Sequence, residues 1–487
     1  MTLAAQMHDW YLVACAAGTV LLLLLLIATR VRLHPALALC IAAVALGVAS
    51  GMPLAKVPLA FTAGVANLMG HIAIILGLGA ILGRLLASSG GAAALGRALV
   101  DGCGKAGLPW ALLALGVIVG MPVFFEVGLV LMMPIVAEAA RRSGKPPIVA
   151  GMPLLAGLSI AHGMLPPHPA AMLAATEYHA DVGRTILWGL VAGVPAAALT
   201  GLGFGQLLTR RWEKRTAKNA ARGLPVAADE PLTLFAPTLA EDLQLESRAK
   251  ESGAGKTMKI PAPSGAVRAA SAILLPIAII FLGSWADSLA APGSGLNAVL
   301  HFAGYPDIAL LIAVLVALGT LGPHLQTGQQ HGPEMLRKLI SESFEPIANV
   351  LVILAAAGGL SGVLRESGAA QATVDLALGA HMPPLVLAWM LAAVVRIAMG
   401  SATVATAVAA GILAPMVGHL GVRPEMLVLA TGAGSLICSH VNDPGFWTVQ
   451  SFFKMEVKDM LKTWTVMETV LSVAGLGTTL ALAAVLR

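Results

Sequence analysis

The residues best suited to chemistry in this sequence are polar side chains inside long apolar stretches. Glu126 is one of them, in the segment Gly120-Met-Pro-Val-Phe-Phe-Glu126-Val-Gly128. An ionisable group in a membrane-like stretch is costly to keep there and usually has a function. Burial favours the neutral form of a carboxyl group, so Glu126 is a candidate to bind and release a proton. The structural alternative is an acid that only caps the backbone of a turn.

Two further apolar stretches are interrupted by proline and polar residues. The first reads His162-Gly-Met-Leu-Pro-Pro-His168-Pro, and the second reads His440-Val-Asn442-Asp443-Pro. Proline removes a helical hydrogen bond, and the freed backbone groups become available to a solute or an ion. We therefore predict that these segments form a binding site, with contributions from His162, His168, His440, Asn442 and Asp443. An interhelical hydrogen bond is the alternative role for the two histidines that begin the segments.

A third polar stretch reads Arg396-Ile-Ala-Met-Gly400-Ser401-Ala-Thr403. Its hydroxyl groups and backbone amides are suited to donate hydrogen bonds to an anion, so Gly400, Ser401 and Thr403 are candidate substrate-binding residues. Arg396 is a further candidate. It either pairs with a substrate carboxylate or neutralises one of the acids named above, and the sequence does not separate these roles.

These polar residues are exceptions in a very apolar chain. Of the 487 residues, 57% are apolar, another 53 are Gly and only 11% are charged, against roughly 25% charged in soluble proteins. This composition excludes a cytosolic enzyme and a secreted disulfide scaffold, and it indicates a polytopic membrane protein. Neither an HExxH nor a GxSxG motif occurs, so we expect a protein that is not an enzyme and that needs no metal or cofactor.

The apolar stretches predict how the chain crosses the membrane. Ten segments are long enough to cross as helices, near residues 10–29, 33–51, 64–87, 148–175, 184–208, 269–289, 305–322, 345–365, 424–452 and 464–486. Residues 108–140 and 383–418 are too long for one span and are broken in the middle, so each is expected to form a re-entrant hairpin. This arrangement places 24 of the 30 Lys and Arg residues on one face and five on the other. The positive-inside rule then puts the amino terminus outside and the long polar loop in the cytoplasm, and it accounts for the basic excess without nucleic acid.

The two halves of the chain resemble each other. Gly83 precedes His162 by 79 residues, and Gly362 precedes His440 by 78. An odd number of spans per half inverts the second copy, as in many transporters. We therefore predict an all-α polytopic membrane protein of two inverted repeats, each of about five transmembrane helices with a re-entrant hairpin and a broken helix. The expected domains are a first membrane repeat at 1–208, a cytoplasmic polar linker at 209–268 and a second membrane repeat at 269–487.

Six segments together resemble the gluconate permease family of proton-coupled symporters, which is similar to the ion transporter superfamily. They are GAILGRLLASSGG, GMPVFFEVGLVLMMPIV, HGMLPPHP, RIAMGSATVAT, SHVNDPGFW and LKTWTVMET. The resemblance implies uptake of gluconate, a related sugar acid or a small hydroxy acid across a bacterial inner membrane. The implied partners are this anionic substrate, protons and the lipid bilayer. Glu126 is the expected proton carrier.

Three positions depart from the pattern expected of the family. Met399 stands where Gln is expected, Pro444 where Ser is expected and Ala170 where Pro is expected. They put the exact substrate in doubt, so a sodium-coupled carboxylate carrier or a D-serine carrier is the alternative. A channel, a sensor that does not transport and a membrane-embedded enzyme are more distant alternatives. The sequence leaves the oligomeric state open, a homo-oligomer included.

Overall fold

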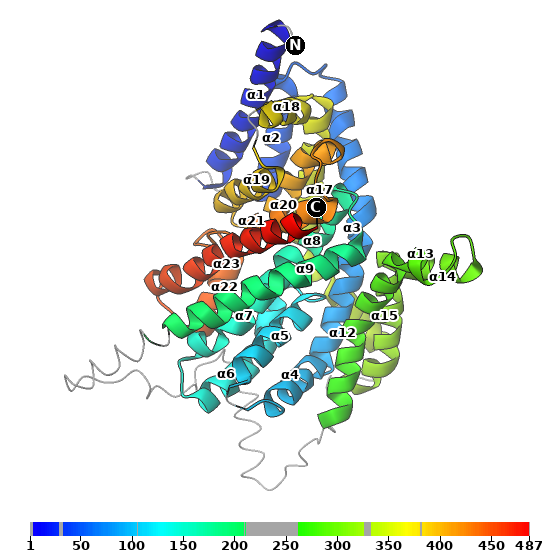
Figure 1. Ribbon diagram of the computed structural model, residues 1–487, viewed down its shortest axis with the longest axis vertical. Coiled ribbons are helices and arrows are strands. Elements are labelled where there is room, and N and C mark those ends of the chain that lie inside the picture. Colours follow the sequence, from blue (N-terminus) through cyan, green and yellow to red (C-terminus); the bar gives the residue numbers. More distant parts are fainter. Residues whose placement is uncertain are drawn as a thin grey trace, which may run out of the picture.

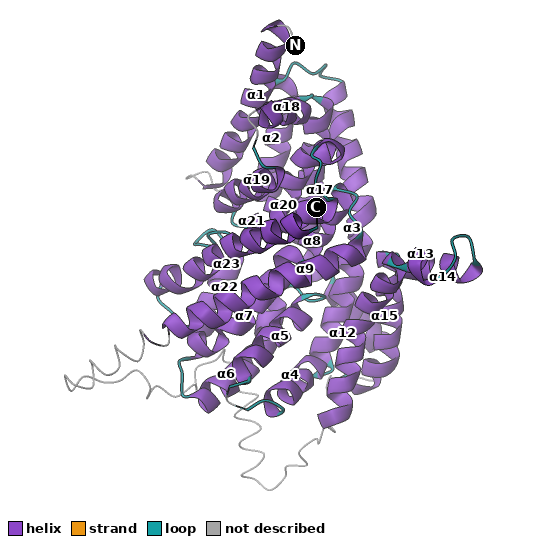
Figure 2. Ribbon diagram, viewed as in Figure 1, coloured by secondary structure: helices purple, strands orange, loops and turns teal. Residues whose placement is uncertain are grey.

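The computed structural model describes residues 3–28, 33–104, 106–208, 210, 262–325, 333–379 and 382–486. All regular elements in these ranges are helices (Figure 2). The helices of the first half are α1 (Leu3–Ala28), α2 (Pro35–Ala49), α3 (Lys56–Ser88), α4 (Gly91–Asp101), α5 (Leu108–Gly120), α6 (Phe125–Ser143), α7 (Pro147–Met164), α8 (Pro169–Glu177), α9 (Val182–Ala197) and the π-helical turn η1 (Ala198–Phe204). Those of the second half are α12 (Ala262–Ser284), α13 (Ala286–Leu289), α14 (Gly295–Gly304), α15 (Pro306–Leu321), η2 (Gly322–His324), α16 (Pro333–Ser343), α17 (Glu345–Glu366), α18 (Ala369–Gly379), α19 (Pro384–Met399), α20 (Ala402–Leu413), η3 (Ala414–His419), α21 (Pro424–Gly434), α22 (Pro444–Phe453) and α23 (Val457–Val485).

Several of these helices can cross a bilayer. Within the described ranges, six helical spans are long and apolar enough, or seven if the bent pair α14 and α15 counts as one. The six are Lys56–Ser88, Pro147–Glu177, Val182–Leu208, Gly265–Ser284, Ile347–Glu366 and Val457–Val485. Large apolar side chains such as Leu37, Val267 and Leu315 are exposed on the outer helices, as expected of surfaces that face lipid. The other four predicted spans correspond to α1, to α2, to the bent pair α14 and α15, and to the broken helix α21 and α22, so six qualifying helical spans stand against the predicted ten.

The two predicted hairpins are present as pairs of helices joined by tight turns. We call α5 and α6 hairpin 1, and α19 and α20 hairpin 2. Hairpin 1 turns between Gly120 and Phe125, and hairpin 2 turns at Gly400 and Ser401. Gly400 has a φ of 72°, the left-handed conformation that glycine adopts readily, and its N–H donates to the carbonyl of Arg396 at 2.9 Å. The turn is therefore set by a glycine at the carboxyl end of α19.

The two predicted helix breaks are also present. We call residues 165–168, between α7 and α8, break 1, and residues 435–443, between α21 and α22, break 2. Proline is the first residue of the helix that follows each break, Pro169 in α8 and Pro444 in α22. Proline fits this position because the first helical N–H has no partner within the helix. The prolines thus restart the chain as helix after each polar segment.

The elements recur in the same order in the two halves. A long helix, a short helix, a hairpin, a broken helix and a final helix occupy α3 to α9 and again α17 to α23. Most of the expected linker lies outside the described residues, and α12 begins at Ala262, before the expected boundary at residue 269. The short helices α4 and α18 and the projecting helix α14 were not predicted. Each is shorter than a membrane span, and α14 meets α15 at 78° (Figure 1).

Corresponding long helices of the two halves pack directly on each other. Helices α3 and α17 run side by side (Figure 1). A Cβ atom added at Gly64 would lie 2.1 Å from the carbonyl oxygen of Gly358, and one added at Gly362 would lie 2.2 Å from that of Ala60. Small residues at such crossings let helix backbones approach closely in a membrane. This contact holds the two halves together beside the broken helices.

The broken helices lie at the centre of the molecule. Nearly all residues of α7 and α21 are buried, and α7 contacts α5, α6, α9, α21 and α23. Such helices are surrounded by protein rather than lipid, so polar groups at their breaks can be satisfied internally. The fold therefore buries break 1 and the Ser439 and Asp443 side chains of break 2, and each break lies against a hairpin.

Candidate functional site

Break 2 and hairpin 2 are joined by a buried ion pair. Arg396, in the last turn of α19, is 5% exposed and pairs with the carboxylate of Asp443. Its guanidinium also donates to the carbonyl of Gly400 at the hairpin tip. Asp443 caps α22 by accepting from the N–H of Gly445 at 2.8 Å. The structure therefore pairs Arg396 with Asp443, one of the three roles that the sequence left open.

Helix α23 braces the same ion pair from the other side. Ser439 donates to the carboxylate of Asp443. The indole N–H of Trp464 donates to the Ser439 hydroxyl at 2.7 Å, and the Thr465 hydroxyl donates to the Ser439 carbonyl at 2.5 Å. Buried charges need such partners to offset their lost hydration. Ser439 and Trp464 are part of this site, although the sequence did not identify them as site residues.

Side chains of break 2 also contact the backbone of hairpin 2. The Asn442 amide donates to the carbonyl of Ile397 at 2.9 Å, and Nε2 of His440 lies 3.1 Å from the same oxygen. A Cβ atom added at Gly400 would lie 2.2 Å from the carbonyl oxygen of Asn442. His440 thus makes the interhelical contact given above as its structural alternative, and only glycine fits at position 400.

Break 1 contains a contact between two histidines. Nδ1 of His162 lies 3.2 Å from Nε2 of His168, and at least one ring must be neutral to accept the hydrogen bond. Phe124 and Phe125, at the start of α6, stack edge-on against His168 and His162, with centroid distances of 6.0 and 6.5 Å. His168 is fully buried. The tip of hairpin 1 therefore covers break 1, as hairpin 2 covers break 2.

The two halves of the site meet at hairpin 1. The Phe125 ring lies 5.5 Å from that of Trp464, which belongs to the other half of the chain. The half-buried side chain of Glu126 follows directly, and the charges of Arg396 and Asp443 act on it. The sequence-predicted acid therefore lies in the electrostatic field of the buried ion pair.

The hydroxyl residues of hairpin 2 have a different environment. Ser401 caps α20, because its Oγ accepts from the N–H of Val404 at 3.4 Å. Thr403 is buried on the same helix, and α20 packs against α8 and α17. The described contacts do not join Ser401 or Thr403 to the ion pair. Ser401 directly follows Gly400, whose carbonyl accepts from Arg396, and Thr403 lies three residues beyond Gly400.

Some buried polar atoms at the site have no hydrogen-bond partner among the described residues. They are Nε of Arg396, Nδ1 of His168 and Oγ1 of Thr406. Buried polar groups usually have partners, so such atoms suit a ligand that supplies them. Across the described ranges, no group of three or more His, Cys, Asp or Glu side chains is arranged to hold a metal ion. The available groups fit a polar solute with several oxygens.

Glu468 is an acidic residue that the sequence analysis missed. It is 2% exposed, in the middle of α23, and accepts a 2.5 Å hydrogen bond from Ser159 of α7. The charges of Arg396 and Asp443 act on it as well. The signal in the sequence is that Glu468 is an ionisable residue in an otherwise uncharged run that follows Lys462.

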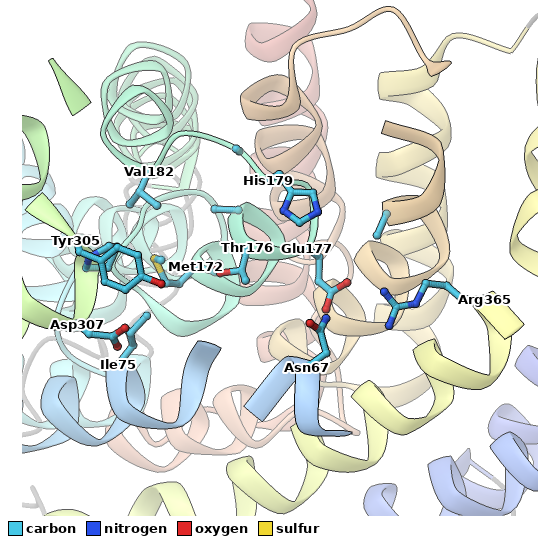
Figure 3. A pocket seen from close by; sticks show the side chains of 14 residues that line it. Asn67, Ile75, Met172, Thr176, Glu177, His179, Val182, Tyr305, Asp307 and Arg365 are labelled. Atoms are coloured by element: carbon cyan, nitrogen blue, oxygen red, sulfur yellow. Dashed lines mark hydrogen bonds between the residues drawn. The ribbon is translucent and has the colours of Figure 1, made fainter. Parts of the chain in front are cut away.

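A separate cavity of about 600 Å³ is lined by residues of α3, α8, α15 and α17 and by residues that follow α8. Its lining includes Asn67 of α3, Glu177 at the end of α8, His179, Asp307 of α15 and Arg365 near the end of α17. Figure 3 shows the side chains of Arg365, Glu177 and Asn67 converging on the same space. The residues predicted from the sequence as substrate-binding do not line this cavity. It is therefore a second polar space, distinct from the breaks.

A family model described as GntP family permease matches residues 10–486. The chain belongs to this permease family. It is 42% identical over 470 residues to a gluconate permease of Pseudomonas aeruginosa, with 96% of this chain and 97% of the relative covered. A high-affinity gluconate transporter of Escherichia coli is 36% identical, with 96% and 97% covered, and the Gnt-II system L-idonate transporter of that organism is 35% identical, with 78% of each covered. This permease is therefore a multi-pass membrane transporter and not an enzyme.

Two solved structures have the same fold. The Alcanivorax borkumensis YdaH transporter is 18% identical, with a TM-score of 0.60, 93% of this chain and 98% of that chain covered. Neisseria gonorrhoeae MtrF is 16% identical, with a TM-score of 0.63, 94% and 97% covered. At this identity the likeness concerns the fold alone. It agrees with an all-helical, multi-span transporter architecture for this permease.

Proposed function

We propose that this permease takes up gluconate or a closely related sugar acid, such as idonate, together with protons across the bacterial inner membrane. The substrate class is supported by the relatives, which cover most of the chain and are named for gluconate or L-idonate. The coupling is supported by one observation above all: Glu126 directly follows Phe125, whose ring packs on Trp464, and Trp464 is linked through Ser439 to the buried Arg396–Asp443 pair.

The charge balance of the site explains how proton binding could drive the uptake of an anion. Arg396 and Asp443 cancel each other, so an ionised Glu126 leaves the site negative and unfavourable for a sugar acid. Protonation of Glu126 removes that charge, and the anion then enters a neutral site. Each ligand thus favours binding of the other, which is the condition for coupling.

The groups proposed to hold the substrate surround this pair. The carboxylate and hydroxyl groups of a sugar acid would accept hydrogen bonds from Arg396, the turn at Gly400 and Ser401, and the amino end of α20 that contains Thr403. His162, His168 and His440 would orient the hydroxyl groups, together with Asn442. Asp443 holds the arginine in place.

We propose that the two halves are inverted repeats whose hairpins enter the membrane from opposite sides. The recurring order of elements supports this arrangement, as do the reciprocal contacts of α6 with α22 and of α20 with α8. The uneven distribution of Lys and Arg favours a cytoplasmic location for the 209–268 linker. Hairpin 1 would then open to the cytoplasm and hairpin 2 to the outside.

On this topology the cavity in Figure 3 faces outward. Arg365, exposed near its rim, would offset the negative charge of Glu177 and Asp307 in the same lining, so that an anion is repelled less on its way to the breaks. Asn67 and Thr176 add polar groups able to contact hydroxyls. We propose that this cavity is the outer vestibule of the permease.

Uptake into vesicles tests the proposed function. Vesicles that contain the purified permease should accumulate labelled gluconate above the external concentration when the lumen is made alkaline, in sodium-free buffer. Unlabelled gluconate and idonate should compete, and D-serine should not. Accumulation that requires sodium at fixed pH would refute the proton coupling, and competition by D-serine alone would refute the substrate class.

A substitution at the proposed proton carrier tests its role. Glu126→Gln should weaken accumulation driven by the pH gradient while counterflow exchange of labelled for unlabelled gluconate continues, because glutamine mimics the protonated acid. Glu425→Gln, at a buried acid in the first turn of α21, is the matched control. Concentrative uptake by Glu126→Gln equal to that of the unaltered protein would rule Glu126 out.

A further inference from the structure

Helix α23 carries a polar stripe that faces both broken helices and hairpin 2. Trp464, Glu468 and Ser472 are spaced four residues apart and therefore lie on one face. Trp464 contacts Ser439 of break 2, Glu468 contacts α7, and Ser472 accepts a 3.0 Å hydrogen bond from the indole of Trp389 in hairpin 2. Each of these side chains is nearly inaccessible to solvent. The stripe thus forms one wall of the central site.

Glu468 is the only carboxyl group of this stripe, and its surroundings do not suit a permanent charge. It is 2% exposed, and its described hydrogen bond comes from the hydroxyl of Ser159 at 2.5 Å. The nearby guanidinium of Arg396 is already paired with Asp443 and bonded to Gly400. A buried carboxylate without a cation of its own costs several kcal/mol. The neutral acid fits this conformation without that cost.

The other charged groups around Glu468 are few. The elements packed on α23 are α7, α9, α19, α21, α22 and η1, and the Phe125 ring of α6, which Glu126 directly follows, contacts Trp464. They bring His162 of α7, Arg396 of α19 and Asp443 at the start of α22 towards the stripe, and the last two act on Glu468 with opposite sign. The ionisable side chains Arg184 of α9 and Glu425 of α21 lie in the first turns of their helices.

We infer that Glu468 is a second proton-binding site of the transport cycle, distinct from Glu126. It receives one proton from water and returns it to water on the other side, and the carboxyl O–H bond is the only covalent bond made and broken. Its partner Ser159 belongs to the other half of the chain, so relative movement of α7 and α23 breaks their hydrogen bond and changes the access of water to the acid. The inference rests on the proposed proton-coupled uptake and adds that two protons accompany each sugar acid.

The number of coupled protons can be measured as the slope of the logarithm of the limiting gluconate accumulation ratio against the pH difference across the membrane. With the membrane potential clamped at zero, each coupled proton multiplies the limiting accumulation ratio by about tenfold per pH unit of gradient. The unaltered protein should therefore accumulate gluconate about 100-fold per pH unit. Glu468→Gln, whose amide oxygen still accepts from Ser159, should reach about tenfold. Glu126→Gln should also reach about tenfold, and the double variant should equilibrate gluconate without concentrating it.

Three controls keep this experiment decisive. Counterflow exchange shows that each variant is folded and binds gluconate, and Glu468→Asp, which restores a carboxyl group, should return a slope above that of Glu468→Gln. Glu425→Gln should keep the slope of the unaltered protein. Equal slopes for Glu468→Gln and the unaltered protein would overturn the inference and leave the proposed function intact. An unaltered protein with no pH-driven accumulation would instead overturn the proposed function.

Discussion

Removal of one charge from the buried Arg396–Asp443 pair should cost far more than removal of both. Asp443→Asn keeps the side-chain oxygen that caps α22 but leaves Arg396 as an unpaired buried cation. Arg396→Gln keeps an amide donor near Gly400 but leaves Asp443 as an unpaired buried anion. With side-chain exposures of 5% and 10%, each single change should destabilise the fold by about 3–5 kcal/mol.

The double variant carries no unpaired charge, so it should lie within about 2 kcal/mol of the unaltered protein, since neutral replacements of buried pairs are often tolerated. The resulting coupling between the two positions is at least about 4 kcal/mol in a double-mutant cycle. The assay is thermal unfolding in detergent, with the exposed pair Glu138 and Arg141 as a control cycle, for which about 0.5 kcal/mol is expected. The double variant should recover stability without recovering uptake, because Arg396 is also proposed to bind the substrate.

This reasoning would be refuted if the stability losses of the two single variants added up in the double variant. If the double variant is as unstable as the sum of the two single variants, the charges do not compensate each other in the folded protein. If all three variants are as stable as the unaltered protein, the pair is open to water. Uptake by the double variant at the normal rate would contradict the role of Arg396 in substrate binding while leaving the pairing intact.

Three further predictions follow from particular contacts. Gly400→Ala should impair folding and uptake, because the new Cβ would lie 2.2 Å from the Asn442 carbonyl oxygen and a φ of 72° costs an L-residue about 1–2 kcal/mol. Gly418→Ala, where nothing lies within 4 Å of the added Cβ, should be tolerated. Equal thermal stability and uptake of the two variants would contradict this prediction. Hydrogen bonds from two arginines lower the pKa of Glu138 from 4.5 to about 2, so these ion pairs contribute under about 1 kcal/mol to the free energy of unfolding above pH 4.5 and lose that contribution as the pH falls towards 2. Glu138→Gln should therefore lower the unfolding temperature at pH 7 and not at pH 2. An equal effect at both pH values would exclude the charge as the cause. Arg365→Gln should raise the half-saturating gluconate concentration by about two- to fivefold at low ionic strength and by less at high ionic strength. A change that does not depend on salt would argue against an electrostatic role of Arg365 at the vestibule.

Much of the architecture was predictable because its signals are local. Pro169 and Pro444 mark the helices after the breaks, and Gly400 marks the tip of hairpin 2, since these residue types limit what the backbone can do. The short helices α4 and α18 were missed for the opposite reason: eleven residues each are too few for a pattern based on membrane thickness.

The partners within the site were less predictable because they depend on tertiary structure. The sequence offered three roles for Arg396, and only the packing of α19 against α21 and the start of α22 selects Asp443. The Ser159–Glu468 hydrogen bond joins residues 309 positions apart, so no local pattern reveals it. Glu468 itself was detectable as a lone acid in an apolar helix, although no proline or turn signal marks its position.

Proton movement driven by the substrate offers a decisive check on coupled uptake. Vesicles with the purified permease, a pH-sensitive dye in the lumen, equal pH on both sides, no sodium and a clamped membrane potential receive an external pulse of gluconate. Because coupling is reciprocal, the lumen should acidify as gluconate enters, and the double variant lacking both Glu126 and Glu468 should admit gluconate with no acidification. Entry of gluconate into vesicles of the unaltered protein with no change in luminal pH would contradict proton-coupled transport by this permease.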